Sequence, residues 1–151
     1  MKRFDDKFIN GLLAGIIAAF ITGPMSLAAK HFKLAELELA DFAGILALGH
    51  VPKSLAESLF ASAVDLMVSG ALGVIFAFLV PAIGRRHLWF KGWFLLGVFW
   101  FIYYPLITIG ILQEIEISVQ THVINGVLAS LFGLVLALAY GWLHPDVPTP
   151  Y

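Results

Sequence analysis

The chain lacks cysteine and has few charged residues. None of its 151 residues is cysteine, which excludes disulfides, thiolate nucleophiles, iron–sulfur clusters and cysteine zinc sites. Only 13% of the residues are charged and the formal net charge is −1, so the basic surface that nucleic acid requires is missing. We therefore expect no nucleic-acid partner.

Recognisable catalytic motifs are also missing. Neither Gly-x-Ser-x-Gly nor His-Glu-x-x-His occurs in the sequence. The long apolar stretches contain one aspartate, Asp65, and a single aspartate cannot form an aspartyl dyad. We predict that the protein is not an enzyme and that it has no catalytic residue, metal site or cofactor.

Apolar length is what the chain has in abundance. Hydrophobic residues make up 60% of it. Four stretches approach the ~20 apolar residues that span a bilayer, at residues 8–29, 59–80, 88–111 and 119–143. These lengths predict an all-α integral membrane protein, a four-span antiparallel helix bundle forming a single membrane domain over residues 1–151. In size and hydropathy the chain resembles small four-span bacterial inner-membrane proteins, a resemblance that implies no site.

A fifth, shorter helix is expected at about residues 34–48, between the first two spans. It is too short to cross a bilayer, so we predict an interfacial or re-entrant helix over the outer mouth of the bundle. Ser54 and Glu57 stand three residues apart, a capping-box spacing that predicts the start of the next helix.

Basic residues predict the orientation. Lys2, Arg3 and Lys7 precede the first span, and Arg85, Arg86 and Lys91 flank the link between the second and third spans. Because basic residues concentrate on the cytoplasmic side, we expect a bacterial inner-membrane protein with both termini in the cytoplasm. Arg85, Arg86 and Lys91 are then the expected contact with anionic lipid.

Small residues indicate helix packing. Gly11, Gly15, Ala19 and Gly23 recur every four residues in the first span, a spacing that allows close helix approach. We assign the same role to three further glycines, Gly73, Gly126 and Gly133, and expect a homo-oligomer or a partner in a membrane complex.

Polar residues mark one face of the helix over residues 54–80. At helical spacing Asp65 shares this face with Ser62 and Ser69. A carboxylate facing lipid would cost roughly 2.5 to 3.5 kcal/mol on insertion scales. The face should therefore turn toward the other helices.

Polar residues of the other three spans lie at a similar depth. Counted by helical rise, Asp65 and Asn125 each lie roughly 9 Å from the outer boundary, which makes Asn125 or His122 the expected neighbour of Asp65. We predict a pocket for a small solute or ion in the outer half of the bundle. Its candidate ligands are Asp65, Ser62, Ser69, His122, Asn125, Tyr104, Thr108 and Thr22.

Two alternatives stay open. The polar residues can serve only as interhelical hydrogen bonds in a non-catalytic accessory or scaffold subunit. Alternatively, His31 and His122 at the outer boundary and His87 and His144 at the inner one form the pairs that a haem-binding redox protein would need.

Overall fold

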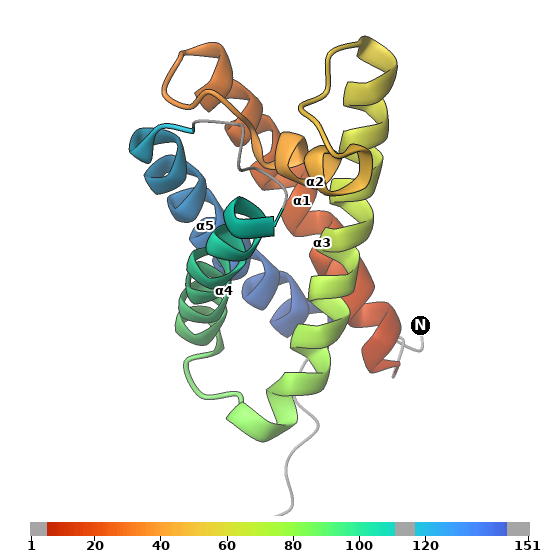
Figure 1. Cartoon of the computed structure of the whole chain (residues 1–151). Helices are drawn as coiled ribbons and strands as arrows, with labels where there is room; N and C mark the ends of the chain where they lie inside the picture. The colour runs from red at the N-terminus through yellow and green to blue at the C-terminus, as the bar shows by residue number, and fades with distance from the viewer. Residues whose placement is uncertain (1–5, 111–116, 145–151) are drawn as a thin grey trace, which may run out of the picture.

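The structure is a computed structural model that describes residues 6–110 and 117–144, with the side chains of residues 104–110 not described. Five helices make up this part of the chain and no strand occurs in it: α1 (Lys7–His31), α2 (Leu39–Leu48), α3 (Leu55–Ile83), α4 (Leu88–Gly110) and α5 (Val119–Leu143) (Figure 1). The prediction of an all-helical fold is confirmed.

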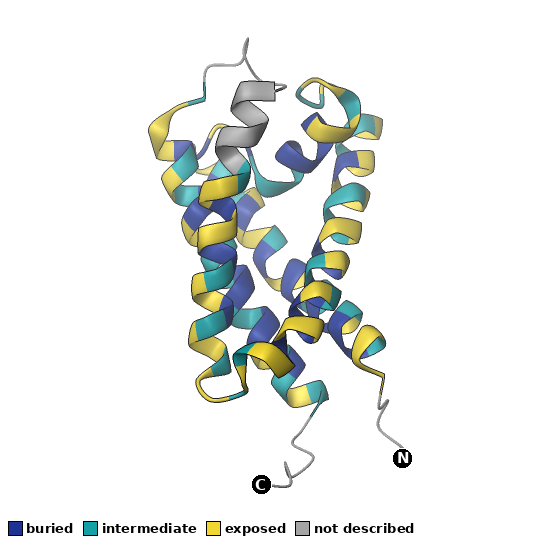
Figure 2. Cartoon of the chain, turned by 60° about the horizontal axis from the view of Figure 1, so that its bottom comes forward, coloured by how far each residue is buried: buried dark blue, intermediate teal, exposed yellow. Residues whose placement is uncertain are grey.

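Three helices are long and apolar enough to cross a membrane, namely α1, α3 and α5. They have 25, 29 and 25 residues, and a helix of about 20 residues already spans the hydrocarbon core. Their outward faces are apolar as well, since Phe20 is 68% exposed and Met67 is 76% exposed (Figure 2). Composition and surface are thus both compatible with insertion into a membrane.

Side-chain caps begin these helices. The Asp6 carboxylate accepts the Phe8 N–H at 2.8 Å, and the Ser118 hydroxyl accepts the Thr121 N–H at 3.3 Å. At α3 the Ser54 hydroxyl accepts the Glu57 N–H at 3.2 Å, which confirms Ser54 as the N-cap. The capping box is not closed on Ser54, because the Glu57 carboxylate accepts the Lys53 N–H instead. Each cap supplies an acceptor to an amide that has no partner within its helix.

Glycines set the closest helix contacts. α1 crosses α3 where Gly11 meets Gly73, and a Cβ built on Gly11 would lie 2.6 Å from the Gly73 carbonyl oxygen. α4 packs on α5 in the same way through Gly92 and Gly133. α1 also packs on α5, whereas the consecutive helices α3 and α4 do not pack along their length. An apolar groove therefore remains between α3 and α4.

The start of α1, the α3–α4 turn and the end of α5 meet at one end of the bundle, which we call the turn end. Asn10 Nδ2 lies 3.2 Å from His144 Nδ1, and Arg85 donates to the His144 carbonyl oxygen. Lys91 Nζ donates to the Gly84 carbonyl oxygen at 3.0 Å, so it caps the C-terminus of α3. The opposite end contains α2, and we call it the α2 end (Figure 1).

The short helix begins at Leu39, five residues later than the start expected near residue 34. Ahead of it, the backbone binds side chains of neighbouring helices. The Glu36 N–H donates to Thr121 Oγ1 at 2.9 Å, and the Leu39 N–H donates to Ser26 Oγ at 2.9 Å. Since these amides are satisfied by α5 and α1, the segment does not need helical hydrogen bonds.

Candidate functional site

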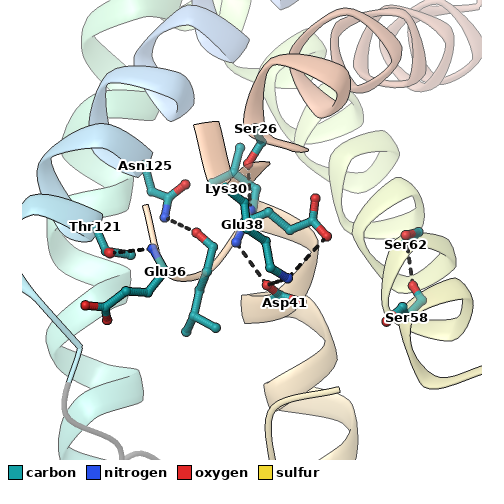
Figure 3. Close-up of polar contacts among 11 residues, drawn as sticks. Ser26, Lys30, Glu36, Glu38, Asp41, Ser58, Ser62, Thr121 and Asn125 are labelled. Carbon is teal, nitrogen blue, oxygen red and sulfur yellow. Dashed lines mark hydrogen bonds and ion pairs between the residues drawn. The ribbon is translucent and has the colours of Figure 1, made fainter. Parts of the chain in front are cut away.

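A partly buried ion pair links α2 to α1 at the α2 end. Lys30 Nζ lies 2.6 Å from Asp41 Oδ2 and 3.7 Å from Glu38 Oε1 (Figure 3). The Asp41 side chain is only 3% exposed, and the same carboxylate oxygen accepts the Glu38 N–H at 3.0 Å. The sequence analysis treated this segment as an interfacial helix and did not find the cluster, because the pairing joins residues on two elements.

Within this cluster, Lys30 compensates the charge of Glu38 less well than the charge of Asp41. Burial, followed by the nearby Asp41 carboxylate, raises the pKa of Glu38 above its ordinary value of 4.5, and Lys30 offsets only part of the rise. Lys30 is therefore shared between two carboxylates and leaves an excess of negative charge at this end of the bundle.

Asn125 holds the segment before α2, and among the described residues Asp65 hydrogen-bonds to neither Asn125 nor His122. Asn125 Nδ2 donates to the Leu37 carbonyl oxygen at 2.9 Å (Figure 3). The expected pairing of Asp65 with either residue is therefore wrong.

Asp65 instead lines a cavity among the five helices. The cavity has a volume of about 100 Å³ and receives side chains from all five helices. Its residues are Thr22, Gly23, Leu39, Phe42, Ala43, Asp65, Val68, Ser69, Leu72, Leu96, Phe99, Trp100, Tyr103, Ala129 and Phe132. Since each water needs about 10 to 15 Å³ by this kind of measure, the space suffices for several waters or a small organic group.

A second hollow meets the first at Asp65. This groove between α1 and α3 has a volume of about 420 Å³ and is bordered by the start of α2. Glu38 and Asp65 are the charged residues among its described lining. Both are acidic, and Glu38 lies close enough for its charge to act on Asp65. The paired hollows thus present carboxylates, while the nearby Lys30 is held by Asp41 and Glu38.

Aromatic rings form much of the central cavity. Phe42 meets Trp100 edge to face with centroids 5.1 Å apart, and Tyr103 lies 6.4 Å from Trp100. Trp100 Nε1 donates to the His122 carbonyl oxygen at 3.2 Å, which fixes the indole. The sequence analysis missed Phe42 and Trp100 as site residues, because their apolar surroundings in the sequence resemble those of any other core residue.

The remaining predicted ligands divide between the hollows and positions elsewhere. Thr22 and Ser69 line the central cavity, and Ser62 lines the groove. Ser62 Oγ donates to its own helix, at the Ser58 carbonyl oxygen (Figure 3). Tyr104 and Thr108 belong to α4, but their side chains lie outside the described residues.

Not all of the residues predicted to pack helices together do so. Gly15 lies against Ser69 of α3, Gly126 lies against Trp100, and Ala19 is buried in the main core. Gly23 packs against no helix, since nothing described lies within 4 Å of a Cβ built on it. It lines both hollows instead, because α1 and α3 diverge beyond their crossing to admit α2.

The four histidines considered for haem lie at the two ends of the bundle. His31 is exposed at the end of α1, and His87 is exposed in the α3–α4 turn. His144 stacks on Tyr140 with ring centroids 5.6 Å apart. Within the described part of the chain, no group of three or more histidine or acidic residues could hold a metal ion.

Comparison with protein-family models, with curated proteins and with solved structures finds no match to this chain. The class that the fold defines is therefore an all-helical protein with three helices able to cross a membrane.

Proposed function

We propose that the protein binds or transports a small cationic solute or ion at the paired hollows around Asp65. The proposal rests on the charge of the lining, because Asp65 and Glu38 line the hollows and are both acidic. The nearby Lys30 is already bound to Asp41 at 2.6 Å. A cation would supply the positive charge that these carboxylates lack.

The proposed setting is the bacterial inner membrane, with α4 as the fourth span of an antiparallel bundle. The turn end faces the cytoplasm, because its basic residues follow the positive-inside rule. The hollows then open toward the outer half of the membrane. Arg86 and the neighbouring hollow lined by Arg85, His87 and Trp89 form the proposed contact with anionic lipid headgroups.

Flux through reconstituted vesicles tests the proposal. Wild-type protein in liposomes is expected to move at least one of proton, sodium, potassium or methylammonium above the protein-free background. Asp65→Asn removes the carboxylate with little change in volume, so it should abolish that flux while thermal stability and elution volume stay unchanged. Ser130→Ala is the matched control, since the Ser130 hydroxyl bonds to its own helix at the Gly126 carbonyl oxygen and Ser130 lines neither hollow.

A scaffold subunit is the second candidate, supported by the close glycine contacts of α1 with α3 and of α4 with α5. In that case wild type and Asp65→Asn would show the same background flux and would bind no small cation. Such a result would contradict the proposed transport or binding function.

A further inference from the structure

The walls of the central cavity are aromatic, and this narrows the class of ligand further than the charge of Asp65 does. Phe42, Phe99, Trp100, Tyr103 and Phe132 line it together with one carboxylate, Asp65. A site for a bare metal ion would be expected to offer several oxygen ligands. Here the remaining polar side chains include Thr22, whose hydroxyl donates to the Ala18 carbonyl oxygen at 2.9 Å.

Aromatic faces and a carboxylate together favour one ligand chemistry. The negative face of an aromatic ring attracts an ammonium group, most strongly one that is desolvated and carries alkyl substituents. A hydrated inorganic cation would lose its water shell to largely apolar walls, whereas an alkylated ammonium has little water to lose.

The cavity also extends toward an apolar groove between α3 and α4. This groove has a volume of about 170 Å³ and is lined by Leu72, Ile75, Phe76, Leu79, Leu95, Leu96 and Phe99. It shares Leu72, Leu96 and Phe99 with the cavity. The groove exists because α3 and α4 do not pack along their length, and it provides space for the apolar part of a ligand.

From this arrangement we infer that the site binds an organic cation, an ammonium group with an apolar substituent. The ammonium lies against Asp65 and the aromatic rings, and the substituent extends past Phe99 into the α3–α4 groove. This inference rests on the proposed function and names the substrate class of the same site.

Titration calorimetry on the purified full chain tests the ligand class. The probe is benzyltrimethylammonium, and the comparison ligand is neopentylbenzene, which has the same shape without the charge. Wild type is expected to bind the cation at least tenfold more tightly than the neutral analogue. Asp65→Asn should weaken binding of the cation by at least tenfold.

Phe99 supplies a variant that separates aromatic recognition from simple apolar contact. Its side chain is 43% exposed, so Phe99→Leu keeps an apolar side chain and leaves the fold little changed. Loss of one cation–π contact should weaken binding of the probe by roughly threefold to tenfold. Phe94→Leu is the control, because Phe94 is 53% exposed on the same helix and lines neither hollow. It should bind within about twofold of wild type.

The possible outcomes distinguish the organic-cation inference from the proposed cation-binding function on which it rests. Equal binding of the probe and its neutral analogue, or no effect of Phe99→Leu, would overturn the organic-cation assignment. If sodium, potassium or methylammonium binds in an Asp65-dependent way while the probe does not bind at millimolar concentration, the assignment fails and the proposed function stands. Asp65 independence for every probe would overturn both.

Discussion

At the scale of single residues, the distribution of charge at the α2 end is the main feature of the molecule. Lys30 serves Asp41 at 2.6 Å and Glu38 at 3.7 Å, and no cationic side chain lines either hollow within the described residues. The carboxylate of Asp65 is therefore the group that a ligand would neutralise.

The Lys30–Asp41 pair should contribute strongly to stability. Lys30→Met leaves the buried Asp41 carboxylate without its cation, and the free energy of unfolding should fall by about 1 to 3 kcal/mol. Lys30→Met combined with Asp41→Asn should lose less, because no charge is then stranded. Chemical denaturation in detergent measures the free energy of unfolding of both variants. Lys33→Met is the control, because Lys33 is an exposed lysine just after α1. If Lys30→Met is as stable as Lys33→Met, the Lys30–Asp41 pair does not contribute to stability.

Glu38 should make stability depend on pH. Because the pKa of Glu38 is raised above 4.5 in the folded chain, the folded state holds the proton more readily than the unfolded state. Its contribution to stability is therefore lost as pH rises from about 4.5 through the raised pKa. Glu38→Gln cannot titrate, so the stability of this variant relative to wild type should increase between pH 4.5 and pH 7.5.

Melting temperatures across that range provide the measurement, with Glu36→Gln as the control for an exposed carboxylate on the same segment. A wild-type advantage that grows with pH would contradict the sign of this prediction.

At the scale of elements, the four-residue ladder of α1 has two different uses. Gly15 lies at the crossing with α3, where an added Cβ would meet the Ser69 carbonyl oxygen, whereas nothing described lies within 4 Å of such an atom on Gly23. The divergence of α1 from α3 between these two positions opens the groove in which Asp65 lies.

Alanine substitutions at the two glycines should therefore have unequal effects. Gly15→Ala forces the backbones apart and should lower stability by about 1 to 3 kcal/mol. Gly23→Ala should lower stability by less, because nothing described on another element lies within 4 Å of the added atom and its steric conflict is limited to the ring of the following Pro24. Thermal unfolding of the two variants makes the comparison, and equal losses would show that Gly15 is not a close contact.

At the scale of the whole molecule, the two ends differ in chemistry. The turn end contains Arg85, Arg86 and Lys91, and two of these bases already have partners, since Arg85 donates to the His144 carbonyl oxygen and Lys91 to the Gly84 carbonyl oxygen. The α2 end contains the acidic cluster.

Cysteine labelling tests the proposed orientation without background, because the chain has no cysteine of its own. Lys53→Cys lies at the α2 end and should react with an impermeant maleimide in intact cells. A cysteine appended after Tyr151 should react only after the cells are permeabilised. The reverse pattern would place the hollows on the cytoplasmic side.

The all-helical fold and the long apolar helices follow from the sequence by itself. Helix length, hydropathy and caps such as Ser54 are local properties, so they can be read from neighbouring residues. Asp65 also stood out locally, as one acid within an apolar stretch.

Only the tertiary structure decided what surrounds Asp65. Sequence depth aligned it with Asn125, but that amide binds the Leu37 carbonyl oxygen. The Lys30–Asp41 pair links α2 to α1, and α2 packs on α3. The aromatic wall with Trp100 likewise depends on how α4 packs on α5. Helical periodicity specifies which residues share a face. It does not specify which face another element meets, because this depends on contacts between residues far apart in the chain.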